Sequence, residues 1–268
     1  MELAEDGRLV VGDDGVGVDE RREPERERAG RVDYPVFDRE IAGRDAADRV
    51  GDPDDVEAVT NGADLGLGCG NPKAIADFEP GETVLDLGTG SGYVLRALRE
   101  TAEIGRGYGL DASPEMLRNA RGYTDDPMVG FLRGDFDALP FETGSIDHVF
   151  SMEAFYYARD PGHTLGEIRR ILRPGGTFYC AVNYYEENEA SHAWQSGIGI
   201  EMTRWDRQRY REAFREAGFH VAEQETIPDR EIEIPPAEAF PTDDWESREA
   251  MVDRYRTWGT LLTVGVVP

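Results

Sequence analysis

The feature that most constrains the fold is a short apolar run, Thr83-Val-Leu-Asp-Leu87, that passes directly into the glycine-rich stretch Gly88-Thr-Gly-Ser-Gly92. A run of this length, closed by glycines, predicts a buried strand followed by a tight turn. Val94, Leu98 and Ala102 then recur at helical spacing and predict a helix. A strand, a turn and a helix in succession are the opening of a parallel β-sheet with crossover helices.

The same alternation of apolar runs and helical periodicity continues to the end of the chain. Further strands are expected at Gly107–Asp111, Val129–Arg133, Ile146–Ser151, Thr177–Val182, from Phe219, and at Thr260–Val267. One helix is expected to start at the cap Ser113-Pro114. A second is expected over Leu165, Ile168 and Leu172, and it should stop at Arg173-Pro-Gly-Gly176. A third is expected over Tyr210, Phe214 and Ala217. The pattern predicts an α/β fold with a doubly wound, mostly parallel sheet, whose ligands bind beyond the carboxyl ends of the strands.

The charge of the chain limits its partners. Lys and Arg number 29 against 55 Asp and Glu, so the net charge is −26, and Lys73 is the sole lysine. A protein that grips DNA or RNA through phosphates needs a basic face, so a nucleic acid partner is not expected. An acidic, lysine-poor surface is instead typical of a halophilic protein that stays hydrated in strong salt. No apolar stretch is long enough to span a membrane and the N-terminus lacks a signal pattern, so we expect a cytoplasmic protein.

The acidity is densest in residues 1–57, which hold few apolar side chains and are expected to be largely disordered. Within them Tyr34, Val36, Phe37 and Ile41 form the one cluster able to dock on a domain. Residues 58–268 form the expected globular domain. Two cysteines and four scattered histidines offer no zinc-type spacing, so no metal site is expected, although a site of carboxylates alone stays open.

The chemistry is expected in the loops that follow the first three strands. Bare glycines at Gly88, Gly90 and Gly92 let a ligand lie against the backbone. Asp111 ends the second strand, where a carboxylate can accept hydrogen bonds from ribose hydroxyls, and Asp135 with Phe136 follows the third, where it can border an adenine. Each feature alone is also compatible with an ordinary turn or cap.

As a set, Val84–Gly92, Gly109-Leu-Asp-Ala-Ser113, Gly134-Asp135 and Arg173-Pro-Gly-Gly176 resemble the successive motifs of class I S-adenosylmethionine (SAM)-dependent methyltransferases, near the branch of the ubiquinone/menaquinone C-methylases. The resemblance implies seven strands with the last antiparallel, and SAM as methyl donor. By it the cofactor-binding residues are Asp86, Gly88, Thr89, Gly90, Gly92, Asp111, Ala112, Asp135, Phe136 and Ser151. The rival, a nicotinamide dehydrogenase, is disfavoured because its loop needs a glycine where this chain has Tyr93.

The acceptor is expected to be a small organic molecule, for example a quinone or a similar lipid precursor. The loop after the fourth strand lacks the Asn/Asp-Pro-Pro-Tyr/Phe motif of enzymes that methylate nucleic acid bases. Methyl transfer needs a base only when the acceptor must lose a proton, and the candidates are His192, Glu153 and Tyr157. Segments 184–205 and 227–258 are expected to cover the acceptor.

Two alternatives remain open. The stretch Gly66-Leu-Gly-Cys-Gly-Asn-Pro72 is similar to a segment of arsenite methyltransferases, whose cysteine thiolates bind trivalent arsenic. Those enzymes use two or three such cysteines, whereas here Cys69 is joined only by Cys180, which lies within a predicted strand. The other alternative is a non-catalytic protein with a SAM-binding fold that acts as a regulatory subunit.

Overall fold

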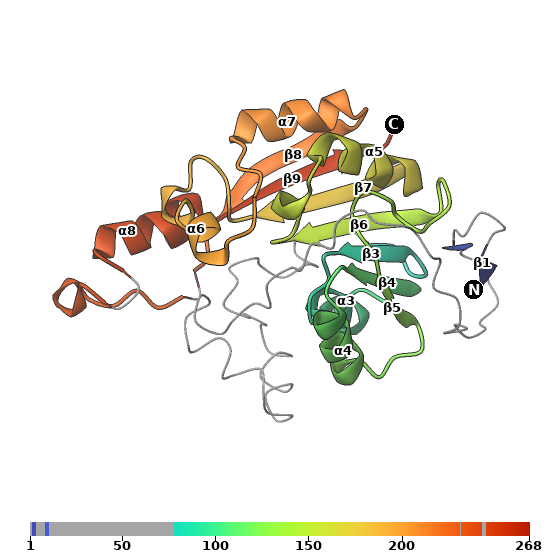
Figure 1. The fold of residues 1–268 in the computed structure, drawn as a ribbon, viewed down its shortest axis with the longest axis horizontal. Helices are drawn as coiled ribbons and strands as arrows, with labels where there is room; N and C mark the ends of the chain where they lie inside the picture. The colour runs from blue at the N-terminus through green and yellow to red at the C-terminus, as the bar shows by residue number, and fades with distance from the viewer. Residues whose placement is uncertain (1, 4–8, 11–77, 231, 243–244) are drawn as a thin grey trace.

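The structure is a computed structural model that describes residues 2–3, 9–10, 78–230, 232–242 and 245–268 (Figure 1). Cys69, the cluster at 34–41 and nearly all of residues 1–57 lie outside these ranges. Two short strands near the N-terminus, β1 (Glu2–Leu3) and β2 (Leu9–Val10), form an antiparallel pair.

A seven-stranded sheet with the order β5-β4-β3-β6-β7-β9-β8 forms the centre of the molecule. Its strands are β3 (Thr83–Leu87), β4 (Arg106–Asp111), β5 (Val129–Arg133), β6 (Ile146–Met152), β7 (Leu172–Val182), β8 (His220–Ile227) and β9 (Thr260–Val266). The last strand in sequence, β9, inserts between β7 and β8 and runs antiparallel to both. The doubly wound fold and the antiparallel seventh strand are therefore confirmed.

Helices cover both faces of the sheet (Figure 1). They are α3 (Tyr93–Thr101), α4 (Pro114–Tyr123), α5 (Pro161–Ile171) and α7 (Arg207–Glu216). One face buries Val94, Leu95 and Leu98 of α3 against Val84 and Phe150, and the other buries side chains of α5 and α7 against Phe178. Each face thus has its own apolar core, as the near-continuous apolar strands require.

Side-chain caps fix where the helices start. The hydroxyl of Ser113 accepts from the amide of Met116 at 3.3 Å, and Pro114 takes the first helical position, as predicted. Asp160 caps α5 in the same way by accepting from the amide of His163 at 3.0 Å. Each cap satisfies an amide that has no partner within its own helix.

The expected end of α5 needs correction. The helix ends at Ile171, and Leu172 pairs with Ile146 as the first residue of β7, so Leu172 is not helical. Arg173-Pro-Gly-Gly176, predicted as a stop between elements, belongs to the strand, and the β6–β7 register shifts between Ile146 and His148. Leucine fits a buried strand as well as a helix, so periodicity alone could not separate the two.

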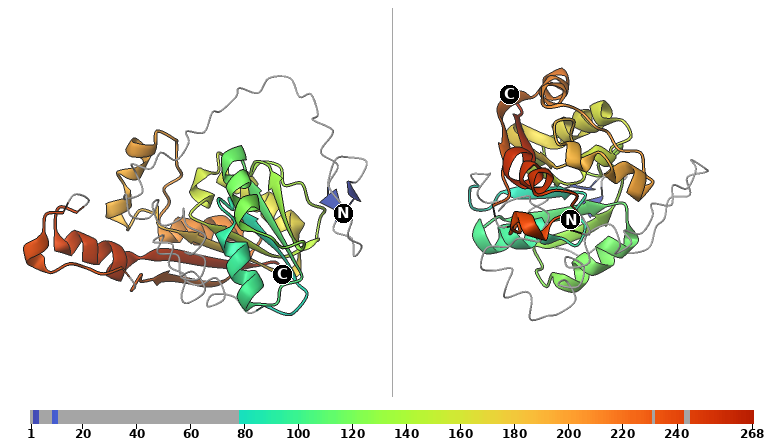
Figure 2. Two further views of the ribbon diagram at one scale, coloured as in Figure 1. Left: turned by 90° about the horizontal axis from the view of Figure 1, so that it is seen from below. Right: turned by 90° about the vertical axis from the view of Figure 1, so that its left-hand side faces the viewer.

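Two connections leave the carboxyl ends of the strands. The first, after β7, holds the short helices η4 (Glu189–Ser191) and α6 (Trp194–Ile198). The second joins β8 to β9 through η5 (Ala237–Ala239), α8 (Arg248–Val252) and the π-helix η6 (Asp253–Trp258), and α8 lies beyond the end of the sheet (Figure 2). None of the described helices is long and apolar enough to cross a bilayer.

Candidate functional site

The glycine-rich loop after β3 is fastened to the end of β4. The amides of Gly88 and Thr89 donate to the carbonyl of Leu110 at 2.8 and 3.1 Å, and the amide of Gly90 donates to the carboxylate of Asp111 at 2.9 Å. The glycine-rich loop and Asp111, the residue expected to bind the ribose, are thus joined directly by a hydrogen bond. The sequence placed them 21 residues apart, and the parallel pairing of β3 with β4 brings them together.

Two glycines in this loop have different surroundings. Gly88 has a φ of +80°, and a Cβ there would lie 2.2 Å from the Cβ of Ala154 and 3.4 Å from the ring of Phe136. Gly90 has a φ of +52°, and a Cβ there would meet no atom within 4 Å. Gly88 is therefore needed for packing, whereas Gly90 faces open space that a ligand can occupy.

Asp86 lies under this loop and is almost completely buried. Its carboxylate accepts from the hydroxyl of Thr89 at 2.6 Å, and 1% of the residue is exposed. Burial, with a smaller contribution from the charge of Asp111, raises the pKa of Asp86 to about 7. A buried carboxylate with a raised pKa gains stability from any cation brought next to it.

Asp111 turns its carboxylate toward the same loop. One oxygen accepts from Gly90 and the other accepts from the amide of Ser113 at 2.8 Å. Burial raises its pKa above the ordinary value, although the amide hydrogen bonds from Ser113, Gly90 and Ala112 oppose that shift. Each carboxylate oxygen can accept more than one hydrogen bond, so Asp111 keeps capacity for hydroxyl donors.

Asp135 and Phe136 follow β5, but they lie in different surroundings. The ring of Phe136 is next to Gly88. Asp135 is half-exposed, accepts from the amide of Asp137 at 2.7 Å and forms an ion pair with Arg159 at 2.7 Å. Phe136 thus borders the loop, whereas the carboxylate of Asp135 is held by Arg159, a partner that no sequence pattern indicated.

The loop after β6 packs on the glycine loop through Ala154. Its first residue, Glu153, has a φ of +54°, which is rare for a residue with a side chain, and its amide donates to the carbonyl of Ala181 in β7 at 2.9 Å. The carboxylate of Glu153 accepts from the hydroxyl of Tyr156 at 3.3 Å. Such strained residues cluster at functional sites, because the surrounding contacts must hold them in place.

Tyr157 and Ser151 border the same loop. Burial, together with the charge of Glu153, raises the pKa of Tyr157 to about 12, so its phenol stays protonated. Ser151 is fully buried at the end of β6, and its hydroxyl has no hydrogen-bond partner in the described part of the chain. The structure therefore brings the candidates Glu153 and Tyr157 together, and leaves a donor group unused beside them.

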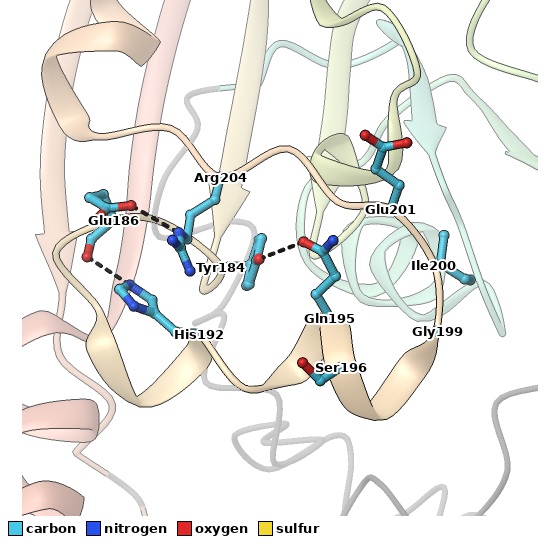
Figure 3. Close-up of a pocket in the computed structure, with 9 residues that line it drawn as sticks. All are labelled: Tyr184, Glu186, His192, Gln195, Ser196, Gly199, Ile200, Glu201 and Arg204. Carbon is cyan, nitrogen blue, oxygen red and sulfur yellow. Dashed lines mark hydrogen bonds and ion pairs between the residues drawn. The ribbon is translucent and has the colours of Figure 1, made fainter.

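His192 lies apart from these groups, in the connection after β7. It lines a cavity of about 710 Å³, where one ring nitrogen, Nε2, lies 2.9 Å from the carbonyl oxygen of Glu186 (Figure 3). The other residues that line the cavity are Tyr184, Gln195, Ser196, Gly199, Ile200, Glu201 and Arg204. Sequence reasoning missed Arg204, because segment 199–205 carries no helix or strand pattern, and it missed Gln195, because the five-residue helix α6 that holds it is too short to give a periodic signal.

Cys180 lies inside β7, fully buried, as predicted for a core residue. Burial raises the pKa of its thiol, which disfavours the thiolate form that binds metals and arsenic. Among the described residues, no three His, Cys, Asp or Glu side chains converge as they would around a metal ion.

Residues 85–180 match the model of a methyltransferase domain. A candidate methyltransferase from Haloferax volcanii, solved in complex with the Trm112 methyltransferase activator, is 62% identical, with a TM-score of 0.75 over 83% of this chain and 97% of that chain. The phosphoethanolamine N-methyltransferase 2 of Haemonchus contortus, solved with S-adenosylhomocysteine, is 21% identical with a TM-score of 0.58, over 77% of this chain and 53% of that chain, and shows the fold alone.

Curated relatives match over a shorter span. An arsenite methyltransferase of Halobacterium salinarum is 43% identical over 135 residues, which are 48% of this chain and 34% of that protein. A sterol 24-C-methyltransferase of Kluyveromyces lactis is 26% identical over 60% of this chain and 46% of its own length. The chain thus spans a third to a half of these two proteins. Because the Haloferax protein is 62% identical and is matched over nearly its whole length, and because the motifs after β3, β4 and β5 all lie at the carboxyl ends of neighbouring strands, this chain belongs to the class I SAM-dependent methyltransferases.

Proposed function

We propose that the protein transfers the methyl group of SAM to a small organic acceptor. The observation that carries this proposal is the open space at Gly90, whose amide donates to the carboxylate of Asp111 and whose neighbour Thr89 donates to the buried carboxylate of Asp86. Bare backbone next to two carboxylates suits a ligand that carries positive charge and ribose hydroxyls. SAM has both.

The remaining cofactor candidates fit the same ligand. Asp111 would hold the ribose, Asp86 would face the cationic methionine portion, and Phe136 would lie against the adenine. Thr89 orients Asp86 through the 2.6 Å hydrogen bond, and Ala112 follows Asp111 directly. Asp135 would border the adenine only if its ion pair with Arg159 leaves an oxygen free to accept.

When bound, SAM supplies an activated methyl group on a sulfonium leaving group. The chain must then align the acceptor with it and exclude water. Glu153 is placed for this because its loop packs on Gly88, and its carboxylate could accept a proton from the acceptor. Tyr157, protonated at neutral pH, would donate a hydrogen bond rather than act as a base.

The two alternatives have weaker support. A non-catalytic protein could fill the donor site with its own side chains, yet the space beside Gly90 is open. Arsenite methylation would need cysteine thiolates at the acceptor, and Cys180 is buried in the core, while Cys69 lies outside the described residues. The similarity to the Halobacterium arsenite methyltransferase therefore does not extend to a thiolate pair in the described part.

Donor binding by the Asp111→Ala variant tests the proposal. We expect the wild-type chain to bind SAM and S-adenosylhomocysteine by calorimetry at high salt, and the variant to bind at least tenfold more weakly, because about 1.4 kcal/mol is lost with the ribose hydrogen bonds. Asp125→Ala, at an exposed position before β5, is the matched control and should bind as the wild type does. Failure of the wild-type chain to bind either compound would refute the proposal.

We also propose that the chain binds a Trm112-like activator at the β5 edge, since the 62% identical Haloferax protein was solved with Trm112. The β5 strand is the outer strand of the sheet and pairs only with β4 in the described part. The large hydrophobic residues of the described chain that are exposed are Met128, at 36%, which directly precedes β5, and Tyr123, at 45%, which ends α4. An open strand edge preceded by an exposed apolar side chain suits a partner that adds a strand.

Substitution of Met128 by aspartate tests this interface. We expect Met128→Asp to weaken binding of Haloferax Trm112 at least tenfold in a calorimetric titration, because a charge would be buried against the partner. Ala222→Asp places the same charge at an exposed position on β8, the opposite edge of the sheet, and should bind normally. If both variants lost affinity for Trm112 equally, or if neither did, the result would argue against the β5 edge as the binding surface.

A further inference from the structure

A series of contacts through the loop after β6 links the cavity lined by His192 to the glycine loop. Ala154 packs on Gly88, and the next residues of that loop lead to Tyr156, whose ring lies 5.7 Å from that of Tyr184, centroid to centroid. Tyr184 lines the cavity. The amide of Thr203 donates to the carbonyl of Tyr156 at 2.8 Å, so the opposite rim of the cavity is fastened to the same loop. The cavity and the glycine loop are therefore both in contact with the loop that follows β6.

The wall of the cavity is polar. Of the residues that line it, Ile200 is the single aliphatic one, and carboxylate, guanidinium, imidazole, amide, hydroxyl and phenol groups make up most of the rest. Figure 3 shows Arg204 and Gln195 reaching toward Tyr184 from opposite sides, while Glu201 points away. Pockets for small organic ligands are usually lined mainly by apolar side chains, and this one is not.

Several of these polar groups keep unused hydrogen-bonding capacity. Nε of Arg204 donates to Glu186 at 2.8 Å, and the two terminal nitrogens of its guanidinium have no partner among the described residues. The amide oxygen of Gln195 accepts from Tyr184 at 3.1 Å, which leaves its NH₂ group available. A lipid placed here would strip water from these donors and offer nothing in return.

From these contacts we infer that this cavity binds the methyl acceptor, and that the acceptor is a water-soluble, oxygen-rich small molecule rather than a quinone, sterol or other lipid. The inference rests on the proposed methyltransferase function. Arg204 and Gln195 would donate to oxygens of the acceptor, with Tyr184 as the wall between them. The volume of about 710 Å³ lies within the range of roughly 300–1,000 Å³ that is usual for small-ligand sites.

The inference can be tested without knowing the acceptor, by following a radioactive methyl group from SAM into different product fractions. The chain, with and without Haloferax Trm112, is incubated at high salt with methyl-tritiated SAM and a Haloferax volcanii extract. The products are separated into precipitated macromolecules, an organic phase and an aqueous low-mass fraction. We expect the label in the aqueous low-mass fraction.

Variants with substitutions in the cavity then test whether the acceptor binds there. Arg204→Gln should lower the initial rate of aqueous labelling at least tenfold with an unchanged SAM dissociation constant, which also shows that the variant is folded. Ser196→Phe, at an exposed position of α6 on the cavity rim, should lower it similarly by filling the space. Arg209→Gln, at a half-exposed arginine that pairs with Glu216 outside the cavity, is the matched control and should keep the rate.

The outcomes are separable. Label in the organic phase or in the macromolecular precipitate would overturn the inference about the acceptor while leaving methyltransferase activity intact. Aqueous label that survives both Arg204→Gln and Ser196→Phe would show that the acceptor binds elsewhere and would equally overturn it. SAM binding with no label in any fraction would contradict the proposed function itself.

Discussion

Alanine at Gly88 is expected to destabilise the protein, whereas alanine at Gly90 is expected to remove donor binding and leave the fold nearly intact. A methyl group at Gly88 would lie 2.2 Å from the Cβ of Ala154, and the φ of +80° strains any side chain. Overpacking and strain together cost about 3 kcal/mol, which lowers Tm by roughly 10 °C in a domain of this size.

At Gly90 the same strain costs about 1 kcal/mol, or roughly 3 °C in Tm, because the added methyl meets no atom within 4 Å. That methyl would occupy the space beside Asp111 where the donor is proposed to lie. Thermal melts paired with SAM calorimetry measure both effects. A Gly90→Ala variant that binds SAM normally would place the donor elsewhere, and an unchanged Tm in Gly88→Ala would contradict the packing on Ala154.

The second large effect is expected at Asp86, whose pKa is raised to about 7 mainly by burial. In the unfolded chain the pKa of this carboxyl is near its ordinary value of 3.8, so between about pH 4 and pH 7 the folded donor-free protein holds a proton that the unfolded chain has lost. Stability therefore falls as pH rises from about 4 through about 7. Asp86→Asn cannot ionise, so this variant should have a higher Tm than the wild type at pH 8 and a similar Tm at pH 5.

Donor binding should respond in the opposite direction. The positive charge of SAM favours the ionised carboxylate, so the affinity of the wild type should rise between about pH 6 and pH 8 with release of a proton. Asp86→Asn should bind at least tenfold more weakly at pH 8 and lose this pH dependence. Calorimetry in buffers of different ionisation enthalpy measures the proton release. A pH-independent affinity in the wild type would show that Asp86 does not face the donor.

Local sequence was sufficient for most of the strands and for the start of α4. The apolar run at 83–87 and the cap at Ser113 lie where predicted, because burial pattern and capping act over a few residues. The prediction that Leu172 belongs to the helix is wrong, because an apolar residue at a helix–strand junction fits the helical and the strand pattern equally well. The positive φ of Glu153 had no sequence signal, because its amide donates to the carbonyl of Ala181 in β7, a strand that only the fold brings beside it.

By itself the sequence determined the sheet, the glycine loop and the family, because these depend on the order of residues along neighbouring strands. Only the tertiary structure decided which side chains share a site. It grouped Glu153 with Tyr157, and it assigned His192 to a polar cavity with Arg204. The physical reason is that such contacts depend on how loops fold over the sheet edge, where short-range periodicity gives no information about distances.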